Sequence, residues 1–112
     1  MAIIVQTSTP KALLAAIRKA IDDGEVATWS YDEDGDFTHT PDQWTGKAWL
    51  RPYTGAGVLS FGLLGHTGTV MTKPLYGVYH GRFIEMLLTH FDRQFATAAA
   101  TALKDEELDN FK

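Results

Sequence analysis

Two separate stretches of the chain carry side chains suited to binding or acid–base chemistry. One is the irregular segment 37–46, and the other is the run YHGR at 79–82, where a strand is expected to lead into a helix. Imidazole exchanges protons near neutral pH, while a helix N-terminus and an arginine side chain both favour anions. If folding brings the two stretches together, they would form a pocket for a small ligand at the start of the last helix. The residues expected to line this pocket are His39, Trp44, Tyr79, His80 and Arg82.

Each of these residues also has a purely structural interpretation. His80 would bond to backbone groups at the beginning of the helix, and Trp44 would close one end of the core. Gly81 would ease the turn from strand to helix and leave Arg82 in solvent. The same residue types therefore predict either a site or ordinary packing, and the position of the two stretches in the fold decides between them.

The sequence contains no motif for a metal, a cofactor or a catalytic nucleophile. The four histidines form no HxH or HExxH pattern, and His80 and His90 lie about three helical turns apart, too far to share an ion. The acidic run DEDGD around Gly35 lacks the closing glutamate of a calcium loop and is typical of a solvated turn. Without a GxSxG or SxxK motif or any cysteine, we predict no catalytic residue, metal or cofactor, although folding can still bring His39, Asp36 and His80 together.

The composition restricts the class of protein. A chain of 112 residues, 45% of them hydrophobic, has the size of one domain with its own core, so we expect a single globular domain over 1–112. The net charge of −4 provides no positive excess for nucleic-acid phosphates. No apolar run has the length of a membrane span, and the first residues show no secretory signal. The lack of cysteine favours a reducing compartment, and the whole composition suits a bacterial cytoplasmic protein.

The most regular pattern in the sequence covers residues 75–100. LYGVYH at 75–80 is typical of a strand, and residues 80–100 have the spacing of a long amphipathic helix. At about 100° per residue, most of the large apolar side chains share one stripe with two polar ones. The stripe comprises His80, Phe83, Ile84, Leu87, Phe91, Gln94, Phe95 and Ala98.

Shorter patterns predict the other elements. Thr9 and Pro10 are suited to begin a helix, and Gly24 is suited to end it. KAWLRPY at 47–53 and GVLSFGLL at 57–64, joined by TGAG, form the clearest hairpin. The remaining segments are expected to be a strand or arm over 2–6, a strand over 25–31, a turn followed by a short strand or an irregular link over 65–73, and a partly frayed acidic tail over 101–112.

These elements predict an α+β fold of the order α-β-β-β-β-α. The sheet would be a four-stranded, mostly antiparallel meander with both helices packed on one face. The other face would then expose aromatic side chains, and such a patch usually marks an interface. We therefore predict a homodimer or a bound protein partner. The residues expected on this surface are Trp29, Tyr31, Trp49, Arg51 and Tyr53.

Two functions from different classes follow. The first is a small acidic, non-enzymatic protein-binding or regulatory module that associates with itself through the aromatic sheet face. The alternative is a small enzyme or ligand-binding protein with a pocket between segment 37–46 and the N-terminus of the last helix. Nucleic-acid binding is a third interpretation, which the acidic charge disfavours.

Overall fold

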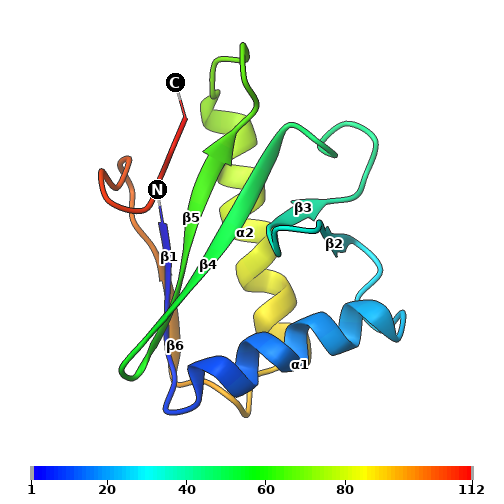
Figure 1. Cartoon of the computed structure of the whole chain (residues 1–112), viewed down its shortest axis with the longest axis vertical. Helices are drawn as coiled ribbons and strands as arrows, with labels where there is room; N and C mark the ends of the chain where they lie inside the picture. Colours follow the sequence, from blue (N-terminus) through cyan, green and yellow to red (C-terminus); the bar gives the residue numbers. More distant parts are fainter. Residues whose placement is uncertain (1, 112) are drawn as a thin grey trace.

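The computed structural model describes residues 2–111, which fold into two helices and six strands (Figure 1). All six strands belong to one sheet in the order β2-β3-β4-β5-β1-β6, and every neighbouring pair is antiparallel. The predicted α+β class with two helices and an antiparallel sheet is confirmed, but the sheet has six strands instead of four. In chain order the elements are β1 (Ala2–Gln6), α1 (Pro10–Asp22), β2 (Trp29–Tyr31), β3 (Phe37–His39), β4 (Ala48–Gly55), β5 (Val58–Gly65), α2 (Lys73–His90) and β6 (Thr97–Ala100).

The predicted hairpin is present as β4 and β5, in the middle of the sheet. Leu50 lies opposite Leu63, and Trp49 lies opposite Leu64. The turn passes through Gly57, whose φ of +72° is a conformation that glycine adopts without strain. Along the first half of β4, buried side chains therefore alternate with partly exposed ones, as expected for a strand with one covered face.

The two ends of the chain meet in the same sheet. β1 lies between β5 and β6, with Ile3 opposite Phe61 on one side and Ala100 on the other (Figure 1). Residues 2–6 therefore form an interior strand of the sheet, so the strand and not the arm is the correct alternative. Strands β2 to β5 follow one another in meander order as predicted, and β1 and β6 add to the sheet beyond β5.

One hydrophobic core lies between the sheet and both helices. α1 contributes Leu13 and Ile17, and α2 contributes Phe83 and Leu87, all with fully buried side chains. Because both helices cover the same face, the opposite face of the sheet has no helix on it in residues 2–111. Neither of these helices combines the length and apolar character that crossing a bilayer would require. The sheet contributes Ile3, Val5, Trp29, Phe37, Leu50, Leu59, Phe61 and Leu63 to the core.

The strand predicted over 75–80 is wrong, because these residues form the first half of α2. Thr72 caps the helix, with its Oγ1 accepting a hydrogen bond from the Leu75 N–H at 3.3 Å, and proline occupies the first turn. Gly81 consequently lies within a helix and not at a strand-to-helix turn. Burial of a helical face outweighs the strand preference of tyrosine and valine. The buried residues of α2 are Leu75, Tyr76, Tyr79, His80, Phe83, Met86 and Leu87.

The long helix predicted to reach Ala100 ends at His90. The Phe91 N–H bonds to the Leu87 carbonyl at 2.8 Å, and the Phe91 side chain still lies in the core. Residues 97–100 form the edge strand β6 against β1. Alanine-rich segments prefer a helix in isolation, but here the open edge of β1 supplies backbone partners, so strand pairing outweighs the local preference.

The C-terminal segment 101–111, predicted as part of a frayed tail, lies against the sheet. Asp109 is only 7% exposed and accepts hydrogen bonds from the Leu63 N–H at 2.7 Å and from the Asp105 N–H at 2.8 Å. Asn110 donates its N–H to the Leu63 carbonyl at 2.9 Å. One carboxylate of the acidic tail is therefore a buried acceptor, placed where β5 extends beyond its pairing with β1.

Candidate ligand-binding site

Segment 37–46 lies against α2, and Tyr79 holds it there. The Tyr79 hydroxyl donates a hydrogen bond to the Trp44 carbonyl at 2.6 Å and lies 2.9 Å from Thr38 Oγ1. The same hydroxyl accepts a hydrogen bond from the His39 N–H at 3.3 Å. Burial raises the pKa of Tyr79, so the phenol keeps the proton that it donates. The two stretches that the predicted pocket requires are therefore neighbours in space.

His39 is 3% exposed, and its ring lies 4.6 Å from the ring of Trp29. Its Nδ1 lies 2.8 Å from the Thr28 carbonyl, which can only accept, so Nδ1 carries a proton and Nε2 is an acceptor in the neutral ring. Nε2 makes no hydrogen bond within residues 2–111 and is not sealed from solvent. Burial lowers the pKa of His39 against the effect of the Thr28 hydrogen bond, and the Arg82 charge lowers it further. The neutral ring is therefore the favoured form.

A hollow of about 260 Å³ opens beside the His39 imidazole. It lies between residues 26–28 before β2, residues 39–41 after β3, and the second half of α2. Its volume is just below the range of about 300–1,000 Å³ that is usual for ligand pockets, so it suits a small molecule. We call this space the His39 hollow. Its lining consists of Val26, Ala27, Thr28, His39, Pro41, Arg82, Glu85, Met86, Thr89 and His90.

Two opposite charges on α2 face this space without being paired to each other. The side chains of Arg82 and Glu85 form no ion pair or hydrogen bond within residues 2–111, and both residues are exposed. Arg82 lowers and Glu85 raises the pKa of His39, which places both charges within electrostatic reach of the imidazole. An arginine without a protein partner can bind a carboxylate or phosphate through two parallel hydrogen bonds. The His39 hollow therefore combines a cation, an anion and a neutral acceptor.

The other residues predicted for the pocket have structural roles. Trp44 is half-buried against the core, and its carbonyl is the acceptor for Tyr79. His80 is 3% exposed, with Nδ1 2.7 Å from the Tyr76 carbonyl, and it does not line the hollow. The structure thus brings two of the five predicted residues, His39 and Arg82, into one hollow.

Glu85 and His90 line the hollow but are not predicted as site residues from the sequence. Arg82, Glu85 and Thr89 have the spacing of one helix face, so the signal of a shared side is present in the sequence. That spacing does not indicate what the side faces. Only the position of residues 26–28 in the fold shows that this side of α2 closes a hollow.

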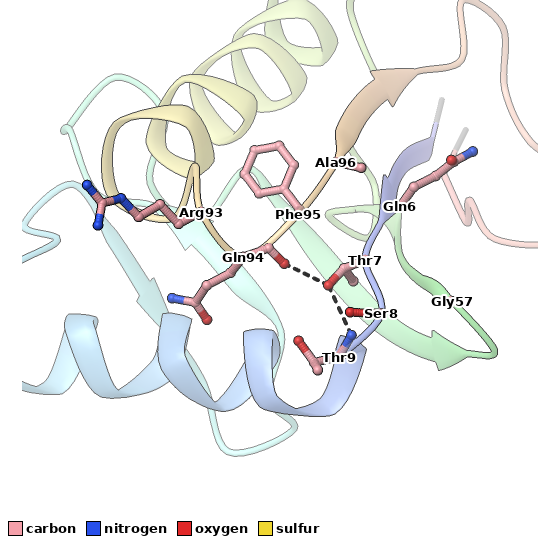
Figure 2. Close-up of a pocket in the computed structure, with 9 residues that line it drawn as sticks. All are labelled: Gln6, Thr7, Ser8, Thr9, Gly57, Arg93, Gln94, Phe95 and Ala96. Atoms are coloured by element: carbon pink, nitrogen blue, oxygen red, sulfur yellow. Dashed lines mark hydrogen bonds between the residues drawn. The ribbon is translucent and has the colours of Figure 1, made fainter.

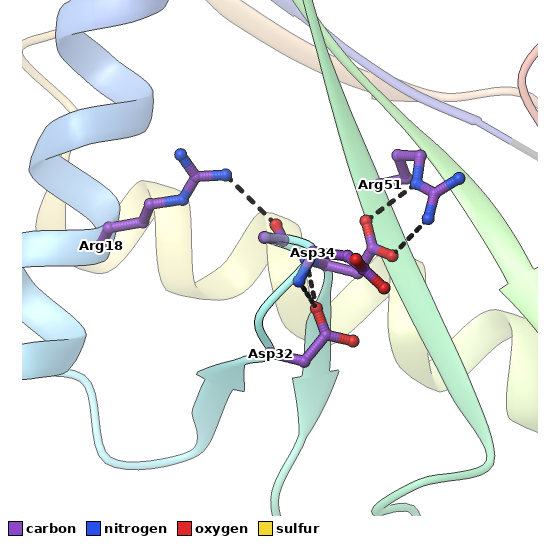
Figure 3. Close-up of polar contacts among 6 residues, drawn as sticks. Arg18, Asp32, Asp34 and Arg51 are labelled. Carbon is purple, nitrogen blue, oxygen red and sulfur yellow. Dashed lines mark hydrogen bonds and ion pairs between the residues drawn. The ribbon is translucent and has the colours of Figure 1, made fainter.

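The acidic run 32–36 is a tight turn closed by its own side chains (Figure 3). Asp32 Oδ1 accepts hydrogen bonds from the N–H groups of Asp34 and Asp36, each at 3.0 Å. Asp36 is 3% exposed, and its carboxylate forms a bidentate pair with Arg51, at 3.0 Å from Nε and 2.8 Å from Nη2. The three aspartates bring carboxylate oxygens within 4.8 Å of one another. The turn and the arginine pair account for this arrangement without an ion.

A second, open hollow of about 590 Å³ lies where β1 leads into α1, beside the link from α2 to β6 (Figure 2). Thr7 joins these segments, since its Oγ1 donates to the Gln94 carbonyl at 2.7 Å and accepts from the Thr9 N–H at 3.2 Å. Thr9 stands at the N-cap of α1 as predicted, but its side chain makes no capping hydrogen bond. Figure 2 shows the Arg93 side chain extending away from the threonines. The hydrogen bonds of Thr7 therefore hold these chain segments together.

Three residues of β4 lie on the sheet face opposite the helices, and we call them the β4 surface. Tyr53 is 40% exposed, and the Arg51 side chain is 43% exposed. Trp49 is half-buried, and its ring stacks on that of His66 at 6.0 Å. No helix of residues 2–111 covers the β4 surface, and the C-terminal segment approaches this face at Gly62, opposite Arg51.

Trp29 and Tyr31 were also predicted for this surface but lie on the other face. They pair with His39 and Phe37 on β3, and Phe37 in turn lies opposite Leu50, a core residue. Trp29 is 2% exposed, and the Tyr31 hydroxyl donates to the Asp22 carboxylate at 2.7 Å. The expected face of β2 is therefore reversed, because the alternation in residues 25–31 shows two faces but not which one the helices cover.

No family model matches the chain, and no curated protein or solved structure is significantly similar to it. Its function is therefore argued from the site geometry. The His39 hollow offers charge recognition by Arg82 and Glu85 together with hydrogen-bond recognition by His39. A neutral imidazole in this position can also take up a proton from a bound molecule.

Proposed function

We propose that this protein binds a small molecule in the His39 hollow, as a binding protein or a small enzyme. One observation supports the proposal most strongly. An almost fully buried histidine leaves Nε2 without a partner in residues 2–111, beside an arginine that is also unpaired there. Nε2 is a hydrogen-bond acceptor that solvent can reach at the hollow, so a bound N–H or O–H donor can take the place of water there.

Two findings favour ligand binding over the protein-binding role that the sequence puts first. The pocket hypothesis required segment 37–46 to lie beside residues 79–82 at the start of the last helix. Tyr79 does contact segment 37–46, although residues 79–82 lie within α2 and not at its N-terminus. The interface hypothesis placed Trp29 and Tyr31 on the exposed face of the sheet, but both lie on the other face. Only the β4 surface remains of the predicted interface.

The four histidines provide an internal test of ligand binding by NMR. His39 and His90 line the hollow, whereas His66 and His80 do not. Small carboxylates, amines and phosphates are added one at a time. With a compound that binds, we expect the ring signals of His39 and His90 to shift and those of His66 and His80 to keep their positions. The proposal is wrong if no compound shifts His39 more than His66.

An arginine pair separates site binding from general charge attraction. Arg82→Gln should weaken the binding of an anionic fragment by about tenfold or more, because a charge-assisted hydrogen bond contributes about 1.5–3 kcal/mol. Arg93→Gln removes an equal charge from an exposed position outside the hollow. We expect the Arg93 variant to bind like wild type, and equal losses in both variants would contradict the proposed site.

A second candidate function is self-association through the β4 surface. The observation that favours it is the presence of Tyr53 and Arg51 on a sheet face without helical cover. We propose a second copy of the chain as the occupant, because Arg51 adjoins the acidic turn at 32–34. A two-fold axis can place the arginine of one copy near the acidic turn of the other, which makes the surface complementary to itself.

We also propose that the protein is located in the cytoplasm. The cysteine-free sequence supports it, and the acidic charge supports a protein that does not bind nucleic acid. Fractionation of the producing cell would test the first point, and retention on heparin would test the second.

A further inference from the structure

The His39 hollow presents three complementary groups to one small ligand. Arg82 supplies positive charge and several N–H donors, and Glu85 supplies negative charge and two acceptor oxygens. His39 Nε2 adds a neutral acceptor in a fixed position, because Nδ1 is anchored to the Thr28 carbonyl at 2.8 Å. A ligand that satisfies all three must carry a carboxylate-like anion and a cationic or neutral N–H donor.

The anion of such a ligand belongs at Arg82. Guanidinium and carboxylate match in plane and spacing, so two parallel hydrogen bonds form without rearrangement of either group. Arg82 has no competing ion pair in residues 2–111. The ligand anion would therefore not need to displace a protein carboxylate from it.

The donor of the ligand belongs between His39 and Glu85. A neutral imidazole accepts one N–H, and the Glu85 carboxylate neutralises the charge of an ammonium group that donates it. An ammonium group also has further protons to donate to a carboxylate such as Glu85. An alcohol can also donate to His39, but it would leave the negative charge of Glu85 uncompensated.

The rest of the lining defines what the ligand carries besides its charges. Val26, Ala27, Pro41 and Met86 form the apolar part of the wall. At about 260 Å³, the hollow has room for a short aliphatic group next to them but not for a long or multiply charged one.

We infer that the ligand of the His39 hollow is a free α-amino acid with a short apolar side chain, its carboxylate on Arg82 and its ammonium group between His39 and Glu85. This inference rests on the proposed function, and it adds the chemical class of the ligand. The two opposite charges are then recognised together, which excludes simple amines and simple acids as equal ligands.

Three probes of similar shape test the class by calorimetry and by the histidine ring signals. L-valine carries both charges, (S)-2-hydroxy-3-methylbutanoate replaces the ammonium by a hydroxyl, and 2-methylpropylamine lacks the carboxylate. We expect L-valine to bind and to shift the ring signals of His39. Each of the other two compounds should bind at least about tenfold more weakly, since each loses one charged contact.

A pair of glutamate variants tests the role of the negative charge. Glu85→Gln should weaken the binding of L-valine by about tenfold and leave the binding of the hydroxy acid unchanged. The preference for L-valine over the hydroxy acid would then disappear. Glu106→Gln removes an exposed carboxylate outside the hollow and should change neither. Amide spectra of both variants confirm that they fold like wild type.

The outcomes separate the inference from the proposed function. If the hydroxy acid binds as tightly as L-valine, or if Glu85→Gln keeps the preference, the amino-acid class is wrong although the site binds ligands. If none of the three probes shifts His39 but inorganic phosphate does, the class is again wrong and the site stands. If no compound of any class shifts His39, the inference and the proposed function both fail.

Discussion

The Tyr79 hydroxyl contacts three polar groups that belong to residues 38–44. Tyr79 is fully buried, and the three groups are Thr38 Oγ1, the His39 N–H and the Trp44 carbonyl. The neighbouring tyrosine of the same helix, Tyr76, is 8% exposed and its hydroxyl makes no hydrogen bond within residues 2–111. The two tyrosines are both buried and differ in the hydrogen bonds of their hydroxyl groups, so Tyr76 serves as a control for Tyr79.

Tyr79→Phe should lower the free energy of unfolding by about 1–3 kcal/mol, because it leaves buried backbone groups without their partner. Tyr76→Phe should change it by less than about 0.5 kcal/mol, since no hydrogen bond is lost. Urea denaturation of both variants measures the difference. Equal effects in the two variants would contradict the role assigned to the Tyr79 hydroxyl.

His39 should make stability depend on pH in the weakly acidic range. Its pKa is lowered in the folded state, so between the folded and the unfolded pKa the unfolded chain binds more protons. The contribution of His39 is therefore complete above its unfolded pKa of about 6.5 and is lost as the pH falls below that value. The other ionisable groups at the hollow are Arg82, Glu85 and His90.

Unfolding curves at about pH 7.5 and pH 5.5 measure this effect. We expect wild type to lose stability on acidification and His39→Gln to lose less, because glutamine does not titrate. His66→Gln, at an exposed position, should keep the wild-type difference. A difference of wild-type size in His39→Gln would show that another group causes the pH dependence.

At the scale of elements, the sequence predicts those whose signals are local. The β4–β5 hairpin has alternating side chains and a glycine turn, and α1 has a proline start and Gly24 just after its end, with φ at +79°. α2 could not be delimited in this way. The run 75–80 contains strand-favouring residues, and only the buried partners of Tyr76 and Tyr79 make it helical.

Two glycines test how the elements pack, because replacing them with alanine should change stability in opposite senses. A Cβ on Gly62 in β5 would lie 2.0 Å from the carbonyl oxygen of Leu108, so the C-terminal segment would have to move. A Cβ on Gly77, on the exposed side of α2, would meet nothing within 4 Å. The first glycine allows a close approach of the backbone, whereas the second has no contact that requires it.

Gly62→Ala should therefore destabilise the protein by about 1–3 kcal/mol through overpacking. Gly77→Ala should stabilise it by up to about 1 kcal/mol, since alanine is the better helix former. Thermal unfolding of both variants measures the two signs. If Gly62→Ala is neutral, the C-terminal segment does not lie across β5 as described.

At the scale of the whole molecule, the parts that could not be predicted from the sequence are those made by distant segments. β1 lies between β5 and β6, and no local pattern in residues 2–6 indicates either neighbour. The His39 hollow has the same character, since residues 26–28, 39–41 and the second half of α2 meet only in the fold. Residue types predicted His39 and Arg82 as site residues, whereas Glu85 acquires its role from the position of its helix.

The sheet also gives the molecule two unlike faces, one covered by both helices and one bearing the β4 surface. Arg51 is a poor probe of that surface, because removing it would leave the buried Asp36 carboxylate without its bidentate partner. Trp49 and Tyr53 are better probes, since neither side chain satisfies a buried charge. Leu88, 56% exposed on α2, serves as a matched exposed residue on the helix side.

If a second copy covers the β4 surface, light scattering should give wild type twice the mass of one chain. Trp49→Ala and Tyr53→Ala should then lower the mass to that of one chain at the same concentration, because large aromatic side chains contribute most to interface energy. Leu88→Ala should leave the dimer intact. A monomeric wild type, or a dimer that only Leu88→Ala dissociates, would remove self-association through the β4 surface, while ligand binding at the His39 hollow would be unaffected because the two lie on opposite faces of the sheet.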